Sequence, residues 1–445
     1  MIEALHDAEA PVATAAAAAL IHIAAPGSVA LLTTALHDSR EQVQREAARV
    51  LVALGPMSIP AVIGLLDQQQ PAVRQRAVGV LSQIGEAAVE PLVATLSHSN
   101  AEAREAAIAA LVQIGTPAVG ALTEALEHEQ ALTREGAVLA LERLHWQPQA
   151  NRAGAAYALM KEDWATCVAC GADAMPPLIS AFRRGSEEDR KHLFGVALHI
   201  GVPALPSLVT LLEHDSEALR QFGCWTLIKI GAPAIAPVNT LMHREETKLR
   251  QTAIFVLRHI QHPQAVDALI EGLKDKEPAV RRACADALQH FGQAVVPQLI
   301  TAMSHENGEI RWESALVLER MGWRPKPDEV GARFLIVKGD WRHCVQIGAP
   351  AVAPLISYLH HWDPNMRQSA AWALGEIGKP SIDPLIATLK EGETVVRMLA
   401  AEVLGHIGDE RAVPPLTALL SDADKEVGDS AYKALTAIDM ANVRR

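Results

Sequence analysis

Residues 73–96 read VRQRAVGVLSQIGEAAVEPLVATL, and this stretch decides the fold class. Its first half carries apolar residues at the three- and four-residue spacing of an amphipathic helix, namely Val73, Ala77, Val80, Leu81 and Ile84. Gly85 stands where a glycine commonly ends a helix with a left-handed cap. Pro91 is tolerated near the start of a second helix, because its missing N–H would lack a partner there. The stretch predicts two short helices, over 73–85 and 88–96.

The same pattern returns along the chain at a regular spacing or a near multiple of it. An apolar residue followed by glycine recurs at Leu54-Gly55, Ile84-Gly85, Ile114-Gly115, Ile200-Gly201, Ile230-Gly231, Phe291-Gly292, Ile377-Gly378 and Ile407-Gly408. Eleven residues before the glycine position stands an arginine, at Arg74, Arg104, Arg134, Arg190, Arg220, Arg250, Arg281, Arg311, Arg367 and Arg397. Since neither helix of one unit buries its apolar face alone, the units must stack. The sequence predicts an all-α fold, an α-solenoid forming a right-handed superhelix of about 13–14 helix pairs.

Composition agrees with this fold. Hydrophobic residues make up 49% of the chain and aromatic residues only 4%, so the core consists mainly of Ala, Leu, Val and Ile. Ala and Leu are the strongest helix formers. No alternating apolar and polar runs bounded by hairpin turns occur, which argues against strands.

The repeat resembles the HEAT family, and within it the short bacterial form known as the PBS-lyase HEAT-like repeat. Residues 278–288 (PAVRRACADAL) and 347–356 (IGAPAVAPLI) carry the resemblance, which extends over nearly the whole chain. In this family the recurring arginine usually pairs with an acidic residue of a neighbouring unit. Acidic residues stand at the matching turns here, at Asp38, Asp67, Asp215, Asp275, Asp363 and Asp422. The resemblance therefore implies that the arginines form a structural ladder rather than a phosphate-binding track.

A second, longer period separates two modified units. LERLHWQP at 141–148 matches LERMGWRP at 318–325, and the same alignment, which we call the long-period register, pairs Trp164 with Trp341. Each modified unit is predicted to contain a helix over about 150–161 or 327–338, then a short helix capped by Asp163 or Asp340. The chain divides into blocks 1–145, 146–322 and 323–445 of one continuous solenoid, and residues 2–7 resemble the end of a second helix, so the first block starts in mid-repeat.

The charge argues against nucleic acid as a partner. The net charge is −12, and residues 1–145 hold 16 acidic residues, 8 arginines and no lysine. Such a surface repels phosphates and suits a basic protein partner, although the charge can equally serve solubility alone. No run of about 18 apolar residues is present, so we expect no membrane span. Five cysteines form no disulfide framework, and we expect a cytoplasmic monomer.

Few residues point to catalysis. Cys170 of the Cys167-x-x-Cys170 motif occupies the apolar position before the glycine, so we interpret it as a core residue; a metal or redox half-site is the alternative. His128-Glu129 and His305-Glu306 are similar to the His-Glu pairs of deoxyhypusine hydroxylase, but only two pairs occur, outside the helices. Histidines recur at the turns, at His37, His98, His128, His214, His243, His305, His360 and His361, where we expect helix C-terminal capping, with a metal-binding or pH-sensing ridge as the alternative. We expect no metal and no cofactor.

Exposed aromatic residues are the most informative feature for function. Trp225, Phe255 and Trp372 stand six residues before the glycine, where these repeats usually place a polar residue, and tryptophan is enriched at binding hot spots. Trp164 and Trp341 are expected to fill the gap beside the shortened helices. Short side chains recur on the second helices, which we expect to line the concave wall, at Ser180, Thr210, Thr240, Thr301 and Ser357.

Three function hypotheses follow. The first is a non-catalytic protein-binding scaffold that uses the concave wall or the exposed aromatic residues. The second is a bilin lyase-like, chromophore-handling protein, which the name of the repeat subtype implies. The third is a metal-dependent enzyme similar to deoxyhypusine hydroxylase. A DNA-binding HEAT-like protein of the alkylpurine glycosylase type is disfavoured, because it needs a basic concave face and the net charge is −12. The first hypothesis predicts that the chain is not an enzyme.

Overall fold

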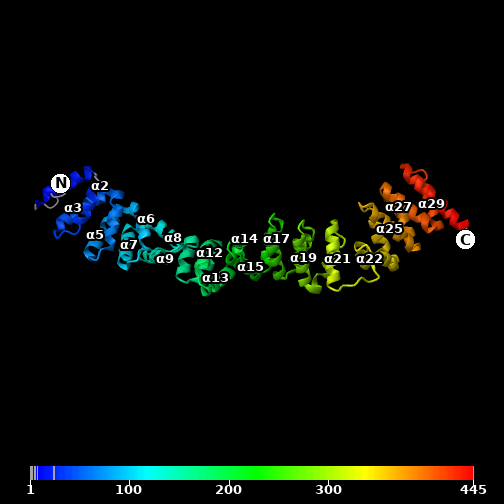
Figure 1. Ribbon diagram of the computed structural model, residues 1–445, viewed down its shortest axis with the longest axis horizontal. Helices are drawn as coiled ribbons and strands as arrows, with labels where there is room; N and C mark the ends of the chain where they lie inside the picture. Colours follow the sequence, from blue (N-terminus) through cyan, green and yellow to red (C-terminus); the bar gives the residue numbers. More distant parts are fainter. Residues whose placement is uncertain (1–3, 5–6, 8, 24–25, 444–445) are drawn as a thin grey trace. The chain divides into compact units, whose positions relative to one another are not determined.

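The computed structural model describes residues 4, 7, 9–23 and 26–443. The chain forms two compact units, which we call unit 1 (residues 1–230) and unit 2 (residues 231–445). Within the described ranges both units are built from helices without a strand, so the predicted all-α solenoid fold is confirmed (Figure 1). The three sequence blocks are a separate division and stay a prediction. The mid-repeat start falls largely on residues outside the described ones.

Each regular repeat consists of a longer helix A and a shorter helix B, whereas helix A is shortened in the two modified units. In unit 1 the A helices are α1 (Ala10–Ile23), α3 (Glu41–Leu54), α5 (Pro71–Ile84), α7 (Ala101–Ile114), α9 (Ala131–Arg143), α11 (Trp164–Ala169), α13 (Glu187–Ile200) and α15 (Glu217–Ile230). The B helices are α2 (Pro26–Ala35), α4 (Ile59–Ile63), α6 (Val89–Thr95), α8 (Val119–Ala125), α10 (Arg152–Met160), α12 (Met175–Arg184) and α14 (Leu205–Leu211). Short 3₁₀ turns lead into or extend most B helices, at η2 (Gly55–Met57), η3 (Gly64–Asp67), η4 (Gly85–Ala88), η5 (Thr116–Ala118), η6 (Gly171–Ala174) and η7 (Val202–Ala204).

Unit 2 repeats this arrangement. Its A helices are α17 (Thr247–Ile260), α19 (Pro278–His290), α21 (Gly308–Arg320), α23 (Trp341–Ile347), α25 (Pro364–Ile377), α27 (Thr394–Ile407) and α29 (Lys425–Val443). Its B helices are α16 (Ile235–Asn239), α18 (Pro263–Glu271), α20 (Val296–Ala302), α22 (Glu329–Val337), α24 (Val352–Tyr358), α26 (Ile382–Glu391) and α28 (Val413–Leu419). The 3₁₀ turns are η8 (Ala232–Ala234), η9 (Thr240–His243), η10 (Gly272–Lys274), η11 (Gly292–Val295), η12 (Ala349–Ala351), η13 (Lys379–Ser381) and η14 (Glu410–Ala412).

Stacked leucines form the core of unit 1. Each regular repeat contributes one fully buried leucine from helix A, at Leu51, Leu81, Leu111 and Leu141, and the same repeat spacing buries a leucine at the end of helix B, at Leu36, Leu66, Leu96 and Leu126. Consecutive A helices pack against each other from α1 to α9 and again from α11 to α15. Each repeat therefore covers the apolar face of the one before it.

The glycine after helix A adopts a different conformation from the one we predicted. Gly85 has φ 77° and ψ −135°, and Gly115 has φ 81° and ψ −137°, so neither is in the left-handed helical region. Gly408 does have the predicted left-handed cap, with φ 72° and ψ 29°. The repeat bends sharply from helix A into a 3₁₀ turn, and the backbone region that this bend requires is essentially restricted to glycine. The constraint on these positions is thus stricter than the predicted cap.

The two modified units are confirmed as shortened repeats. The predicted helices appear as α10 and α22, and the Asp163 and Asp340 carboxylates accept the backbone N–H of Thr166 and His343 as N-caps of α11 and α23. α11 has 6 residues and α23 has 7, whereas α5 has 14. Since α11 and α23 align with the C-terminal half of a regular A helix, the first two turns of helix A are missing in each unit.

Candidate partner-binding surfaces

The ten ladder arginines bind the turn that precedes their own helix. In the common form one guanidinium nitrogen donates to the two backbone carbonyls five and six residues earlier, as Arg104 does to Ser99 at 2.9 Å and His98 at 2.7 Å. The same kind of bond is made by Arg74, Arg134, Arg190, Arg220, Arg250, Arg281, Arg311, Arg367 and Arg397. Each arginine thereby satisfies carbonyls left unpaired at the end of helix B.

The acidic partners of the ladder differ from the expected set. Four ladder arginines pair with a carboxylate of the next repeat: Arg74 with Glu102, Arg250 with Asp275, Arg281 with Glu313, and Arg397 with Asp422. Asp275 and Asp422 are therefore two of the six aspartates that we predicted. Of the others, the Asp38 carboxylate accepts the Arg40 N–H and Asp363 caps α25, whereas the Asp67 carboxylate accepts from the Asn100 side-chain amide of the next repeat at 2.7 Å. The carbonyl bonds, rather than acidic partners, are common to the whole ladder.

Five of the eight turn histidines act as hydrogen-bond acceptors. Nδ1 accepts the backbone N–H two residues later, as in His214 (2.9 Å to Ser216) and His361 (3.1 Å to Asp363), and likewise at His98, His128 and His305. Asp275 makes the equivalent bond to Glu277. Histidine thus replaces an aspartate turn acceptor, which differs from the cationic cap that we predicted, because a protonated Nδ1 cannot accept.

The candidate catalytic groups lie in structural positions. Cys167 and Cys170 are buried, and burial raises the pKa of the Cys167 thiol to about 12, which disfavours the reactive thiolate. His128 and His305 belong to the turns described above. Among the described residues, no three His, Cys, Asp or Glu side chains come together as in a metal site.

The predicted aromatic residues lie at the surface. The exposed fraction is 46% for Trp225, 40% for Phe255 and 46% for Trp372. Trp225 lies on α15 in unit 1, whereas Phe255 and Trp372 lie on α17 and α25 in unit 2. Trp362 is more exposed than any of these, at 82%, and follows α24 directly.

The short side chains of the B helices are also placed at the surface. Thr210, Thr240, Thr301 and Ser357 are exposed and Ser180 is half-buried. The four exposed hydroxyls each donate to a carbonyl one turn earlier in the same helix, so they present mainly methyl or methylene groups to solvent. Ser180 accepts from Arg184 at 2.5 Å instead.

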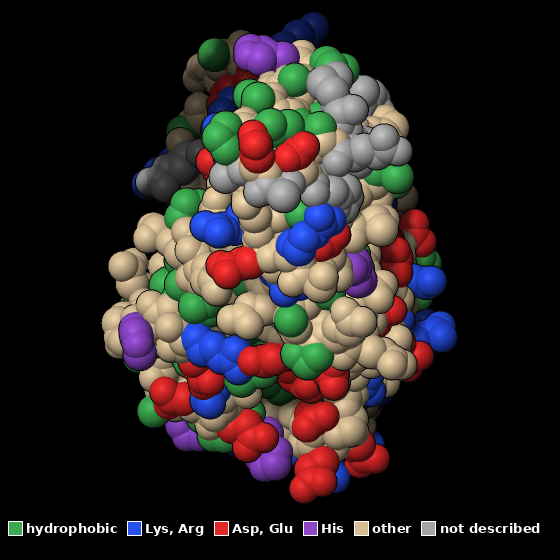
Figure 2. Space-filling view, turned by 90° about the vertical axis from the view of Figure 1, so that its left-hand side faces the viewer, with side chains coloured by type: hydrophobic (Ala, Val, Ile, Leu, Met, Phe, Trp, Pro, Cys, Tyr) green, Lys and Arg blue, Asp and Glu red, His purple; other side chains and the backbone are tan. Residues whose placement is uncertain are grey.

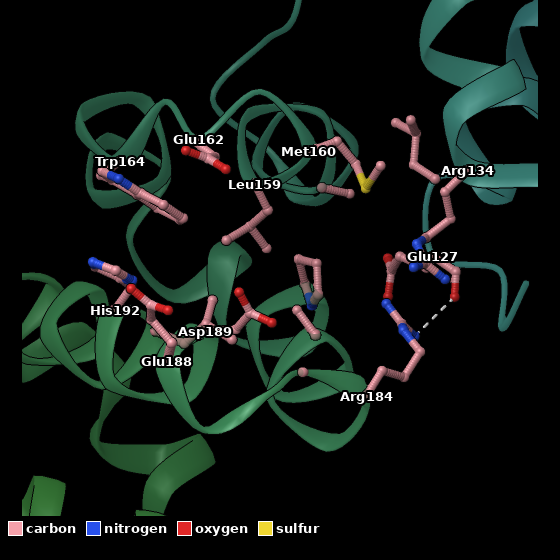
Figure 3. Close-up of a pocket in the computed structure, with 16 residues that line it drawn as sticks. Glu127, Arg134, Leu159, Met160, Glu162, Trp164, Arg184, Glu188, Asp189 and His192 are labelled. Carbon is pink, nitrogen blue, oxygen red and sulfur yellow. Dashed lines mark hydrogen bonds between the residues drawn. The ribbon is translucent and has the colours of Figure 1, made fainter. Parts of the chain in front are cut away.

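A hollow opens in unit 1 where the modified repeat lacks its first helical turns. This unit-1 hollow has a volume of about 510 Å³ and lies between the end of α8, the helix α10 and the start of α13. Figure 3 shows Arg134, Glu127 and Arg184 at one end, Leu159 and Met160 in the middle, and Trp164, Glu162 and His192 at the other end. Trp164 stacks on His192 with 6.2 Å between ring centroids, so it covers part of the gap.

Unit 2 contains the corresponding hollow in the long-period register. This unit-2 hollow, of about 620 Å³, is lined by Arg311 and Pro354 at the positions of Arg134 and Pro177. Its lining has diverged elsewhere: Tyr358, His361 and Trp362 replace Ala181, Arg184 and Gly185. Tyr358, His361 and Trp362 stack in succession, and the Arg311 guanidinium lies 6.0 Å from the Tyr358 ring.

A further hollow in unit 2 brings two tryptophans to one surface. It has a volume of about 510 Å³ and is lined by Gly339, Asp340, Trp341, Arg342, Gln368, Ser369 and Trp372. Trp341 is half-buried against the core, while Trp372 rises from α25. We call it the Trp341–Trp372 hollow. The long-period register places Gly195 where this hollow has Trp372.

Charges at the N-terminal end of unit 1 are mixed. Figure 2 views this end, where acidic and basic side chains are interspersed without a continuous basic area.

By length and composition alone, Pro71–Thr95 could cross a membrane, and two bent helix pairs, Ala101–Ile114 with Thr116–Ala125 and Glu187–Ile200 with Val202–Leu211, pass the same test together. In the fold Pro71–Thr95 comprises α5, η4 and α6, whose leucines lie in the unit-1 core. The expected absence of a membrane span stays a prediction.

Comparison with known families agrees with this geometry. The family model of HEAT repeats matches residues 59–142, 89–161, 235–319 and 382–443, which together exceed half of the chain. This chain belongs to the HEAT-repeat family. A model of Armadillo/beta-catenin-like repeats also matches residues 345–379, and a comparison with curated proteins gave no match.

Solved structures with a similar fold include three kinds of protein. Human deoxyhypusine hydroxylase is 20% identical, with 54% of this chain and 98% of that chain covered and a TM-score of 0.22. A structure from work on the interaction between cadherin and beta-catenin is 14% identical, with 98% and 99% covered and a TM-score of 0.28. Kap121p is 12% identical, with 99% of this HEAT chain but only 56% of Kap121p covered and a TM-score of 0.26.

Proposed function

We propose that this HEAT-repeat chain is a non-catalytic scaffold that binds another protein. The supporting observation is the Trp341–Trp372 hollow, where a 46%-exposed tryptophan stands beside an open concave surface. Binding hot spots typically combine a tryptophan with a neighbouring pocket that excludes water on association. Trp372 supplies the first element and the hollow supplies the second.

The B helices offer a second surface for the same function. Thr210 and Thr240 present short side chains whose hydroxyls are already bonded to the helix backbone. A partner segment can approach such a wall closely without breaking hydrogen bonds. Replacing Thr210 or Thr240 with arginine would block this approach by bulk and charge, and would leave the Trp341–Trp372 hollow unchanged.

The composition supports further details of the proposal. The acidic N-terminal block suits a basic partner protein. All five cysteines are free and buried, which is typical of a protein kept in a reducing compartment such as the cytoplasm. We further propose that the chain is a monomer and that its repeats are of the short PBS-lyase HEAT-like subtype, as residues 278–288 and 347–356 suggest.

Comparative affinity capture tests the proposal. The wild-type chain and its Trp372→Ala variant would be immobilised and exposed to an extract of the source cells, with Tyr432→Ala as the control. Tyr432 is an exposed aromatic residue on α29, outside every hollow described above. We expect a protein that the wild type and the control retain and that Trp372→Ala loses. If no protein distinguishes the variant from the wild type, the Trp341–Trp372 hollow is not the binding surface.

A further inference from the structure

We propose that the unit-1 hollow binds an acidic side chain of a partner polypeptide, with its carboxylate received between Arg134 and Arg184. This inference rests on the proposed scaffold function and names the chemistry of one contact. It follows from the hydrogen bonds and ion pairs of the groups at the basic end of the hollow.

Arg134 and Arg184 stand near each other without a carboxylate of their own. Arg134 donates to the carbonyls of His128 and Glu129 at 2.8 Å, and Arg184 donates to the carbonyl of Glu127 at 3.3 Å. Burial, followed by the positive charge of Arg134, lowers the pKa of Arg184. The two guanidinium groups therefore repel each other in a partly desolvated place, and a bound carboxylate would relieve that repulsion.

The nearby carboxylates are already engaged by other arginines. Both oxygens of Glu127 are held by Arg152, at 2.7 and 3.0 Å, and Glu129 pairs with Arg183. Neither Arg134 nor Arg184 has an ion pair among the described residues. Figure 3 shows that Arg134 and Arg184 approach Glu127 from opposite sides at one end of the hollow. A carboxylate of the partner would meet two guanidinium donors there, beside the Glu127 carboxylate, whose charge Arg152 already neutralises.

The missing turns of helix A explain why the basic end is open. In some regular repeats the ladder arginine meets a carboxylate of the following A helix, as Arg74 pairs at 2.6 Å with Glu102. After Arg134, the corresponding turns of α11 are absent, and α10 places Leu159 and Met160 beside the gap instead. The shortening of α11 therefore removes the helical turns from which the chain itself would supply a carboxylate.

Unit 2 differs from unit 1 at the corresponding place. At the same two positions it has Arg311 and His361, and an Arg311 guanidinium nitrogen lies 3.4 Å from Nε2 of His361. Arg311 also has no ion pair among the described residues of unit 2. Because Nδ1 of His361 accepts a backbone N–H and burial lowers the pKa of this imidazole, the unit-2 hollow holds one cation, Arg311, where the unit-1 hollow holds two.

The rest of the unit-1 hollow narrows the chemistry of the partner. Leu159, Met160 and Leu193 offer an apolar surface beyond the arginines, and Glu162 and Glu188 stand at the far end. This acidic end repels a polyanion, which excludes a nucleic-acid backbone as a good fit. The complementary peptide segment has an acidic residue that faces Arg134 and Arg184, an apolar spacer, and a basic residue that faces Glu162 and Glu188.

Binding of synthetic peptides to the full chain tests the inference. The probes are fluorescein-labelled peptides with a glutamate and a lysine separated by leucine spacers of varied length, and matched peptides carry glutamine or phosphoserine in place of glutamate. We expect the glutamate peptides to bind more tightly than the glutamine ones by fluorescence anisotropy. Arg184→Gln should reduce that affinity about tenfold, since it removes a charged hydrogen bond.

Two further variants separate the hollow from a general effect. Arg143→Gln removes the same charge elsewhere in unit 1, where the side chain pairs with Glu105 outside the hollow, and should change the affinity less than twofold, as a surface pair does. Ala181→Tyr introduces the side chain that Tyr358 supplies in unit 2, and should block binding by filling the hollow without a change of charge. It also covers the case in which Arg184→Gln fails to fold.

Each contrary result is decisive. Equal binding of glutamate and glutamine peptides, or equal losses in Arg143→Gln and Arg184→Gln, would overturn the inference. Tighter binding of phosphoserine than of glutamate would replace the carboxylate by a phosphoryl group and overturn it too. If these peptides fail while the captured protein still depends on Trp372, the scaffold function stands and only the acidic contact is wrong.

Discussion

Removal of the Arg250 side chain tests the structural ladder most sharply. Arg250 is only 3% exposed, and its guanidinium donates to the carbonyls of Arg244 and Glu245 and lies 2.8 Å from the Asp275 carboxylate. The Arg250→Ala variant leaves that carboxylate buried without its cation and the two carbonyls without their donor. We expect unit 2 to lose stability well beyond the average for a surface substitution.

The expected magnitude comes from the burial of the pair. Breaking a buried ion pair by removing one partner costs about 3–5 kcal/mol, because the remaining charge is left uncompensated. The Arg367 guanidinium donates to the carbonyls of His361 and Trp362 and has no ion pair among the described residues, so Arg367→Ala should cost about 1.5–3 kcal/mol, the range for a hydrogen bond to a charged group. Arg282, which is exposed and outside the ladder, serves as the control and should change stability by less than about 0.5 kcal/mol.

Urea unfolding followed by far-UV circular dichroism measures these differences. Asp275→Asn added to Arg250→Ala should recover part of the loss, since it removes the buried unpaired charge. The reasoning is refuted if Arg250→Ala costs no more than Arg367→Ala. It is also refuted if the second substitution destabilises the first variant further.

Three other predictions concern the repeat turn, the exposed aromatics and pH. Gly85→Ala forces a side chain into φ 77° and should cost about 1–3 kcal/mol, whereas Gly79→Ala, in the middle of α5 with open space at Cβ, should stabilise by about 0.5–1 kcal/mol; thermal unfolding of both compares them. Trp225→Ala or Phe255→Ala should weaken a captured partner about thirtyfold if either is a hot spot, with a melting temperature within a few degrees of wild type; a large stability loss would show that the residue belongs to the core. Burial lowers the pKa of His361, so its contribution to stability is present above about pH 6.5 and is lost as pH falls. The free energy of unfolding should therefore differ less between pH 7.5 and pH 5 in His361→Asn than in wild type. An equal difference in the two proteins would contradict this prediction.

The fold could be predicted from the sequence because the same apolar, glycine and arginine positions recur in most repeats. The positions of Leu81, Leu111 and Leu141 recur once in every repeat, so one apolar pattern identifies the core of several repeats. The caps Asp163 and Asp340 were recognisable because both copies of the modified unit carry them. The conformation of Gly85 was predicted wrongly, since glycine tolerates several regions with positive φ and the sequence does not state which one the turn uses.

The candidate sites were harder to predict, because they depend on the missing first turns of helix A in the modified units. Sequence reasoning identified the exposed position of Trp372, but not its pairing with Trp341 around a hollow. It also missed Arg184, which no motif marks, and it identified His361 only as one of the turn histidines. Their signal is the long-period register, in which both follow a shortened helix and face a ladder arginine.

Hydrogen–deuterium exchange of the captured complex tests the central claim most directly. The exchange of backbone amides would be compared between the free chain and the chain bound to the protein that Trp372→Ala fails to retain. The account predicts slower exchange on binding in residues 339–372, which contain α23 and the start of α25 around the Trp341–Trp372 hollow. Unchanged exchange throughout these residues would contradict the proposal that this HEAT-repeat chain binds its partner through this surface.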